Sequence, residues 1–301
     1  MTRITFPGLG IGPIVVDPIA FTVFGVSVTW YGLLITCGMV LAFFYCLHRA
    51  KQEGIKSDDV IDLAIVTVIL SILGARLYYV VFAFEEFIAT GGTPLQNFWN
   101  TFLAVINIRN GGLAIYGGII GGFFAGLIIS KVKKIRFPIL LDVLVGGVMI
   151  GQIIGRWGNF INGEAYGYEC KLPWRMGIEK CAIGTSFWSE MIEVHPTFFY
   201  ESLWNLIGFV ILCIFYKKKK FNGQVFAFYM LWYGAGRAVI EGFRSDSLWL
   251  FGEGTVRVSQ ALGIGTAIVG IIILVLGFIK IYKGIDIWAD LMSEFKPKKK
   301  H

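Results

Sequence analysis

Long runs of hydrophobic residues, separated by short polar segments, organise the whole chain. Seven runs have roughly 20 residues or more, the length that a helix needs to cross the hydrocarbon core of a bilayer. They cover residues 22–47, 60–83, 112–130, 138–157, 197–216, 223–243 and 258–281. The pattern predicts an all-α polytopic membrane protein with seven transmembrane helices.

Basic residues fall between these runs in a way that fixes an orientation. Of 27 Lys and Arg residues, 17 lie in four segments, which are 49–56, 131–136, 217–220 and 280–301. Lysine and arginine gather in cytoplasmic loops. We therefore expect the N-terminus outside, the C-terminus in the cytoplasm, and outward loops at 84–111, 158–196 and 244–257. The net charge of +7, which in another chain would suggest nucleic-acid binding, follows from this topology.

Composition supports one membrane-embedded domain followed by a short tail. Hydrophobic residues make up 56% of the chain and the mean hydropathy is +0.69, which excludes a soluble domain of this length. Residues 1–284 form the predicted domain. Residues 285–301 form a basic cytoplasmic tail, either an interfacial helix with Trp288 on its apolar side or a frayed end.

Three arginines are predicted at or near membrane depth, where charged groups are costly and usually functional. They are Arg76, Arg156 and Arg237. Four polar residues of the sixth hydrophobic run share one helical face, at spacings of four, four and three residues. They are Tyr233, Arg237, Glu241 and Arg244. This face favours an anion site, although an Arg237–Glu241 pair that only ties helices together is the alternative.

A polar motif ends the fourth hydrophobic run. It contains Arg156, Asn159, Asn162 and Glu164. A guanidinium group binds phosphate through paired donors, two carboxamides can orient a polar headgroup, and a carboxylate accepts hydrogen bonds. The motif points to an enzyme or carrier for an anionic lipid, with Glu164 as a structural partner of Arg156 in the alternative interpretation.

Other familiar chemistries have no motif in the chain. No His, Cys, Asp and Glu cluster has metal-ligand spacing. Phosphate-binding loops, dinucleotide fingerprints and hydrolase nucleophile elbows are also missing from the sequence. His195, before a predicted helix, is typical of a cap, and Tyr31 is equally typical of an interfacial aromatic belt.

Residues 155–167, GRWGNFINGEAYG, resemble the signature of the prolipoprotein diacylglyceryl transferase family. Further matches follow in the same order along nearly the whole chain, at 30–32, 74–76, 110–113, 142, 195–201 and 233–244. The resemblance implies a multi-pass enzyme of the bacterial plasma (inner) membrane, with its active site toward the outer leaflet. Such an enzyme transfers the diacylglyceryl group of phosphatidylglycerol to the lipobox cysteine of a prolipoprotein signal peptide. A thioether forms, glycerol phosphate leaves, and no cofactor or metal is used.

The chemistry of that reaction suggests roles for the polar residues. A thiol with a reference pKa of about 8.5 must become a thiolate, and the leaving phosphate must be stabilised. We assign Arg156 and Arg237 to the phosphate, and we expect Glu164 and Glu241 to orient the arginines. The residues expected to hold the lipid headgroup are Tyr31, Asn159, Asn162, Gly167, Tyr233 and Arg244, with Arg156.

One position departs from the family pattern. The family often has His-Gly-Gly in the third helix, with a base role assigned to the histidine, whereas this chain has Tyr116 before Gly117 and Gly118. Tyrosine, with a reference pKa of about 10, is a poor base at neutral pH. We therefore expect Tyr116 to position a substrate atom and not to accept the proton.

The sequence leaves open two other classes of protein and one disulfide bond. An anionic-lipid flippase or anion transporter would use the same arginines but needs access from both sides, and a structural scaffold would not need them. Cys170 and Cys181 share an outward loop. They either form a disulfide that closes the loop over the site or remain two thiols, because spacing alone does not decide pairing.

Overall fold

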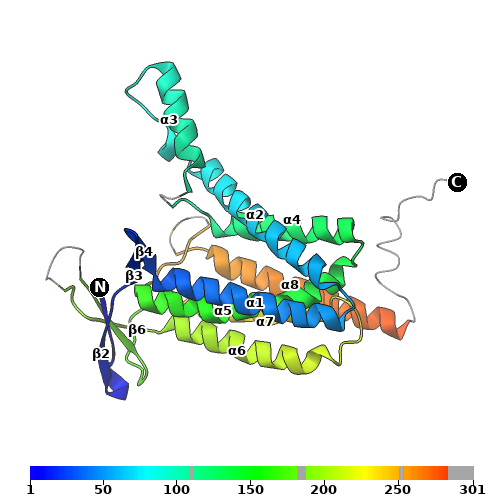
Figure 1. Ribbon diagram of the computed structural model, residues 1–301. Coiled ribbons are helices and arrows are strands. Elements are labelled where there is room, and N and C mark those ends of the chain that lie inside the picture. Colours follow the sequence, from blue (N-terminus) through cyan, green and yellow to red (C-terminus); the bar gives the residue numbers. More distant parts are fainter. Residues whose placement is uncertain (109–110, 182–187, 251, 253, 284–301) are drawn as a thin grey trace. The chain divides into compact units, whose positions relative to one another are not determined.

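Most of the chain is helical. The computed structural model describes residues 1–301 except 109–110, 182–187, 251, 253 and 284–301. Within these described residues, six helices are long and apolar enough to cross a membrane. They are α1 Trp30–Gln52, α2 Ser57–Phe82, α4 Ile115–Lys133, α5 Phe137–Asn162, α6 Thr197–Tyr216 and α8 Val258–Tyr282 (Figure 1). The predicted class of polytopic membrane protein is confirmed.

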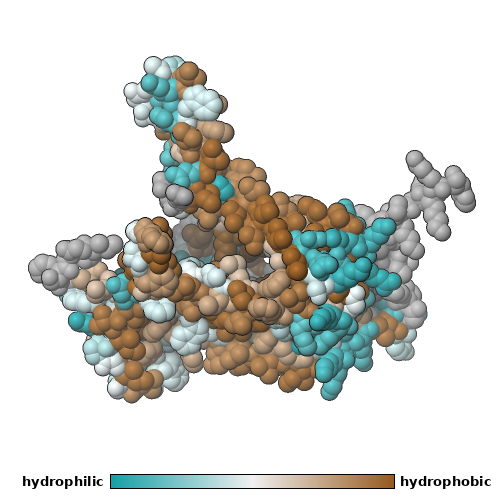
Figure 2. Space-filling view, in the orientation of Figure 1, coloured by the Kyte–Doolittle hydropathy of each residue, from teal (hydrophilic) through white to brown (hydrophobic). Residues whose placement is uncertain are grey.

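The helices belong to two compact units. The first unit contains residues 1–46 and 141–301, and the second contains residues 47–140. In both units large hydrophobic side chains are exposed along the helices, and Figure 2 shows that the surface is hydrophobic over most of their length. Such a surface suits acyl chains and not water.

The seventh predicted span is shorter than the others. α7 covers Gln224–Ile240 and continues into one 3-10 turn, η4 Glu241–Phe243. At 1.5 Å per residue its 17 residues extend about 26 Å. α7 is not among the six helices that meet the length and hydropathy of a span.

The start of the first span was predicted too early. The sequence analysis placed it at residue 22, but α1 begins at Trp30. The preceding residues form an antiparallel hairpin, in which β3 Ile19–Val23 pairs with β4 Val26–Thr29. Phe24 and Gly25 both have positive φ angles, 49° and 79°, as two-residue hairpin turns require. Hydropathy alone does not separate this apolar hairpin from the helix that follows.

A second sheet corrects the expectation that the fold is entirely helical. Its strands lie in the order β2-β1-β5-β6 and all neighbours are antiparallel. The strands are β1 Thr2–Phe6, β2 Ile11–Val16, β5 Met176–Lys180 and β6 Ile192–Val194. Ile4, Ile178 and Val194 are fully buried in its core. The sheet joins the N-terminus to the predicted outward loop 158–196, and thereby fixes the segment beyond the polar motif.

In the second unit, α2 and α4 pack closely through glycines. A Cβ atom at Gly117 would lie 2.2 Å from the Gly74 carbonyl oxygen, and one at Gly121 would lie 2.1 Å from that of Leu70. Small residues of this kind let two membrane helices approach closely. The closest contacts fall on Gly117 and Gly121, one residue before the regularly spaced Gly118 and Gly122.

A helix that the sequence analysis did not expect lies in the loop 84–111. α3 Pro94–Ile106 follows a 3-10 turn, η2 Phe84–Phe87. Thr93 and Gln96 form a reciprocal capping box at its start, with proline in the first turn, where its missing N–H costs nothing.

Cys170 and Cys181, whose pairing the sequence leaves open, are two free thiols in the structure. The two residues contact different positions of the segment 188–193. The Cys170 N–H donates to the Glu193 carbonyl (3.0 Å), and Cys181 pairs with Trp188. Positions 188 and 193 are about 16 Å apart in extended chain, whereas bridged Cα atoms lie within about 7 Å. The predicted tail helix at 285–301 lies outside the described residues.

Candidate functional site

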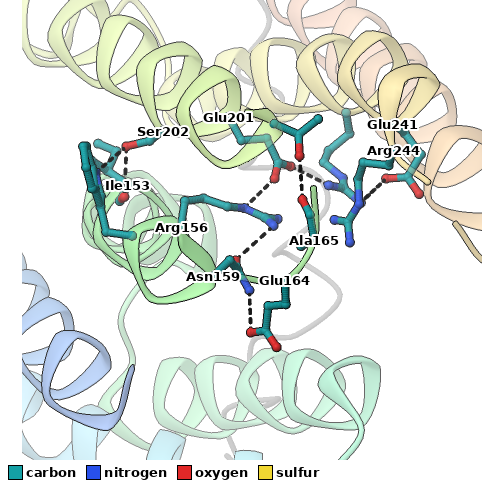
Figure 3. A network of polar contacts seen from close by, with 12 residues as sticks. Ile153, Arg156, Asn159, Glu164, Ala165, Glu201, Ser202, Glu241 and Arg244 are labelled. Atoms are coloured by element: carbon teal, nitrogen blue, oxygen red, sulfur yellow. Dashed lines mark hydrogen bonds and ion pairs between the residues drawn. The ribbon is translucent and has the colours of Figure 1, made fainter. Parts of the chain in front are cut away.

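A buried carboxylate joins two of the membrane-depth arginines. Glu201 lies in the first turns of α6, and its side chain is 4% exposed. One oxygen forms an ion pair with Nε of Arg156 from α5, and the other accepts a hydrogen bond from Nη1 of Arg237 in α7 at 2.5 Å (Figure 3). Three helices therefore meet at one carboxylate.

Arg237 is held on its other side by Glu241. Nη2 of Arg237 donates to Glu241 Oε2 at 2.6 Å, across one turn from α7 into η4. The Glu241 side chain is 2% exposed, and its backbone carbonyl accepts a hydrogen bond from Arg257. The predicted contact between Arg237 and Glu241 is confirmed. It forms one half of a larger network, because Glu201 holds the opposite nitrogen.

The polar motif forms a second branch from Arg156. α5 continues to Asn162, so Arg156 and Asn159 share a face, and Nη1 of Arg156 donates to Asn159 Oδ1 at 3.4 Å. Glu164 accepts hydrogen bonds from the carboxamides of Asn159 (3.0 Å) and Asn162 (3.3 Å). Glu164, which the sequence predicts to orient the arginines, reaches Arg156 through a carboxamide. Glu164 orients the two carboxamides, and Asn159 connects it to Arg156.

Arg244 lies beyond the helical part of the site, where the chain is extended. It donates two hydrogen bonds to Asp246, at 3.0 and 2.8 Å, and its Nε is 4.0 Å from Glu241. Burial opposes ionisation of Asp246, but the hydrogen bonds and charge of Arg244 outweigh burial and lower the pKa of that carboxyl. Arg244 and Asp246 thus stay an ion pair at neutral pH.

Gly167 sets the position of Arg244 through its backbone. The two residues form an isolated antiparallel bridge, and the Gly167 N–H donates to the His195 carbonyl at 3.0 Å. A Cβ atom at Gly167 would lie 2.6 Å from both His195 Cβ and the Phe243 carbonyl oxygen. Gly167 therefore serves close chain packing beside the site.

Tyr31 and Tyr233 occupy different surroundings. The ring of Tyr31, in α1, covers Gly158 of α5, where a Cβ atom would meet its Cδ2 at 2.3 Å. Tyr233 stacks on Tyr229 in α7, with ring centroids 5.5 Å apart. On the same helix, Gly234 admits the α8 backbone and Gly236 admits the Trp204 indole.

The other two predicted polar residues belong to the second unit. Tyr116 is half-buried at the start of α4, with its ring 6.3 Å from that of Tyr78. Arg76 donates five hydrogen bonds of 2.7–2.9 Å, all to backbone carbonyls. Their acceptors are Ala104, Val105, Asn107, Gly111 and Gly112. All five guanidinium N–H groups are thereby used, so Arg76 holds the chain and does not bind phosphate.

Glu201 contacts two of the candidate site residues and was not predicted from the sequence. An acidic residue inside the apolar run 197–216 is as costly as the arginines, and that signal alone could have found it. Within the described residues, no group of three or more His, Cys, Asp or Glu side chains is placed to hold a metal ion.

Fold and site together define an integral membrane protein whose apolar helices hold fixed guanidinium and carboxamide groups suited to an anionic headgroup. Residues 18–276 match the family model described as prolipoprotein diacylglyceryl transferase. Two similar proteins carry the name phosphatidylglycerol–prolipoprotein diacylglyceryl transferase. The one from Clostridioides difficile (strain 630) is 43% identical over 256 residues, 85% of this chain and 93% of the relative. The one from Bacillus cereus (strain G9842) is 36% identical over 260 residues, which are 86% of this chain and 91% of the relative. The chain belongs to the prolipoprotein diacylglyceryl transferase family.

Replacing Gly167 by alanine should lower activity by about 10²-fold, because the new methyl group displaces the segment that positions Arg244. The measurement is initial transfer rate with purified protein. Gly265→Ala in α8 is the matched control, since a Cβ atom there has no neighbour within 4 Å. Equal rates for the two variants would contradict the packing role of Gly167.

Acidification should destabilise the segment that contains His195. Burial lowers the pKa of this imidazole below its ordinary value of 6.5, so the folded protein binds the proton less readily than the unfolded chain. The stability from neutral His195 is present above pH 6.5 and is lost as the pH falls through the folded-state pKa. The melting temperature in detergent should fall between pH 7.5 and pH 5.5, and this fall should be larger for the parent than for His195→Gln. Identical losses would contradict the prediction.

Proposed function

We propose that this protein transfers the diacylglyceryl group of phosphatidylglycerol to the lipobox cysteine of prolipoproteins, the first step of bacterial lipoprotein maturation. The cysteine sulfur forms a bond to the terminal glyceryl carbon. The carbon–oxygen bond to phosphate breaks, and glycerol phosphate leaves with the electron pair while the thiol loses its proton. The observation that carries the proposal is the placement of Arg156 and Arg237 on one buried carboxylate, Glu201, inside a membrane protein.

Arg156 is the residue best placed to bind the phosphate. Its side chain is 22% exposed, against 11% for Arg237. Glu201 takes Nε and Asn159 takes Nη1, so the donors of Nη2 have no hydrogen bond to a described residue. A fixed guanidinium that needs no rearrangement stabilises charge as it develops on the leaving group.

Arg237 acts beside it in a more buried place. Both of its Nη nitrogens bind carboxylates, so it fixes Glu201, which in turn fixes Arg156. Its positive charge also favours a nearby thiolate and the leaving phosphate. Glu241, and Arg244 beyond it, complete this positioning.

The glycerol headgroup would bind the polar end of α5. Asn159 and Asn162 are held by Glu164, so their remaining hydrogen-bond positions are preorganised for hydroxyl groups. We also assign Tyr31 to this headgroup, because its exposed ring lies on Gly158, one residue before Asn159. Tyr233 and the Gly167 backbone line the neighbouring segments in this proposal.

Tyr116 remains a proposed positioning residue for a substrate oxygen or thiol. Tyr116→Phe should lower the transfer rate without moving the alkaline limb of the pH–rate profile. Tyr116→His should be tolerated, because the family often has histidine at this position. A shifted alkaline limb in the phenylalanine variant, or an inactive histidine variant, would contradict this role.

We further propose seven spans with the N-terminus outside. α6 and α8 both end in basic residues, at Lys217–Lys220 and at Lys280 and Lys283, so both run toward the cytoplasm. α7, which packs along α8 through Gly234 and Gly270, must then cross in the opposite direction. Its length of about 26 Å, with η4 added, suffices for most of a hydrocarbon core of about 30 Å. The polar site then faces the outer leaflet of the bacterial inner membrane, and residues 1–284 form the membrane domain.

The decisive experiment uses purified full-length protein in phosphatidylglycerol vesicles with a peptide that carries a lipobox cysteine. Mass analysis should show addition of one diacylglyceryl group. Vesicles of phosphatidylcholine alone, and a peptide with serine for the cysteine, are the controls and should give no product. An anionic-lipid flippase would instead move labelled lipid between leaflets and leave the peptide mass unchanged.

A further inference from the structure

α3 exposes its apolar side, and two half-buried residues of its opposite, polar side are bound to its own unit. At 100° per residue its large apolar residues fall within an arc of roughly 160°. Six of them are 47–67% exposed. They are Leu95, Phe98, Trp99, Phe102, Leu103 and Ile106. A helix on the surface of a water-soluble protein has the reverse arrangement.

The polar side of α3 has partners within the second unit. Asn97 exchanges hydrogen bonds with the backbone of Gly92, at 3.0 and 3.2 Å. Thr101 accepts one from the Ala89 N–H at 2.9 Å. Because these bonds fix the rotation of the helix about its axis, its exposed apolar side is a defined surface of the fold.

Arg76 places the end of α3 beside the membrane-crossing part of α2. It binds the Ala104 and Val105 carbonyls in the last turn of α3. Arg76 lies six residues before Phe82, the last residue of α2, which is about 9 Å along the helix axis. The final turn of α3 is therefore held near the depth of Arg76.

The exposed apolar surface is continuous from α2 to α3. Val81, Phe82, Phe84 and Ile88 are all at least half exposed and lead from one helix to the other. Figure 1 draws α3 steeply inclined to α4, so if α4 crosses the bilayer, α3 extends along its surface.

We propose that α3 lies in the interface of the outer leaflet, with its apolar side among the lipid acyl chains. α3 contains no charged residue, so the binding comes from apolar burial and not from attraction to anionic headgroups. The occupant of this surface is thus the lipid bilayer in general, distinct from the phosphatidylglycerol consumed in the proposed reaction. The inference rests on the membrane class of the protein and not on its enzymatic activity.

Trp99 lies within the apolar arc and provides the test. The full-length protein is placed in vesicles whose phospholipids carry bromine on the acyl chains, which quench tryptophan on contact. The chain has nine tryptophans, so the Trp99 signal is taken as the difference between the parent and Trp99→Phe. In Trp99→Phe with Asn100→Trp, the matched control, the indole moves to the polar side. The signal of Trp99 should fall at least twofold in brominated lipid, and that of the control should change little.

Varying the lipid composition tests whether headgroup charge matters, and varying the protein-to-lipid ratio tests for contact with a second copy of the chain. Quenching should be the same in neutral and in anionic vesicles and should persist at high salt. A Trp99 signal unaffected by bromination would overturn the proposal. A signal that depends on the protein-to-lipid ratio would indicate contact with a second copy of the chain and would overturn it equally. The melting temperature of each variant in detergent, compared with that of the parent, reports whether the variant is folded.

Discussion

Glu201→Gln should abolish most transfer activity and also destabilise the protein. The substitution keeps the shape of the side chain but removes the charge that faces Arg156 and Arg237 at a position 4% exposed. Removal of one partner from a buried ion pair typically costs about 3–5 kcal/mol, because the remaining charges are left uncompensated. We expect a loss of at least about 10²-fold in transfer rate, measured with peptide and phosphatidylglycerol, together with a lower melting temperature in detergent.

Ser202→Ala is the matched control for Glu201. Ser202 is the next residue of α6, is similarly buried, and is hydrogen-bonded to Trp157 and to the Ile153 carbonyl. Its loss should cost about 1 kcal/mol of stability and leave the transfer rate nearly unchanged. Adding Arg237→Gln to Glu201→Gln should cost less stability than the sum of the single changes, since the two groups face each other. Full additivity, or normal turnover in Glu201→Gln, would remove Glu201 from the site.

Local parts of the site could be predicted from the sequence because helix geometry fixes them. Arg237 and Glu241 are four residues apart, and Arg156 and Asn159 are three apart, so one continuous helix brings each pair together. Both contacts are present. The link through Glu201 joins three helices that are distant in sequence, and it depends on how those helices pack. Spacing along one helix carries no information on such packing.

For Arg76, the sequence identifies the residue but not its binding partners. The sequence predicts it at membrane depth, in the same class as Arg156 and Arg237. Its five carbonyl acceptors lie 28–36 residues further along the chain, in a loop whose helix was not predicted. The cost of burying a guanidinium indicates that a partner exists, but it does not distinguish a ligand phosphate from backbone carbonyls.

The β3–β4 hairpin and α3 were missed because mean hydropathy does not report secondary structure. The β3–β4 hairpin is as apolar as the start of a span, and only its turn residues distinguish it. α3 combines one apolar side with one polar side, so its average resembles that of a loop. The signals that could have found it are the capping box of Thr93 and Gln96 and the separation of its two sides around the helix.

Arg156→Lys should reduce kcat/KM by about 10²- to 10³-fold, while the protein still folds and inserts. A lysine keeps the positive charge and can pair with Glu201, but it lacks the planar fork that binds Glu201 through Nε and leaves other donors for the phosphate. Loss of one preorganised donor at a developing negative charge typically has an effect of this size.

Arg3→Lys provides the same chemical change outside the site. Arg3 pairs with Glu179 in the four-stranded sheet at 2.7 Å, and its side chain is 33% exposed. Its replacement should therefore change the rate less than twofold. The division between kcat and KM gives the role of Arg156. A fall in kcat indicates an interaction made in the transition state, whereas a rise in KM alone indicates uniform binding of the headgroup. We expect the fall in kcat, because charge becomes concentrated on the phosphate oxygens only as the carbon–oxygen bond breaks. Near-normal turnover of Arg156→Lys would show that phosphate stabilisation depends on another residue.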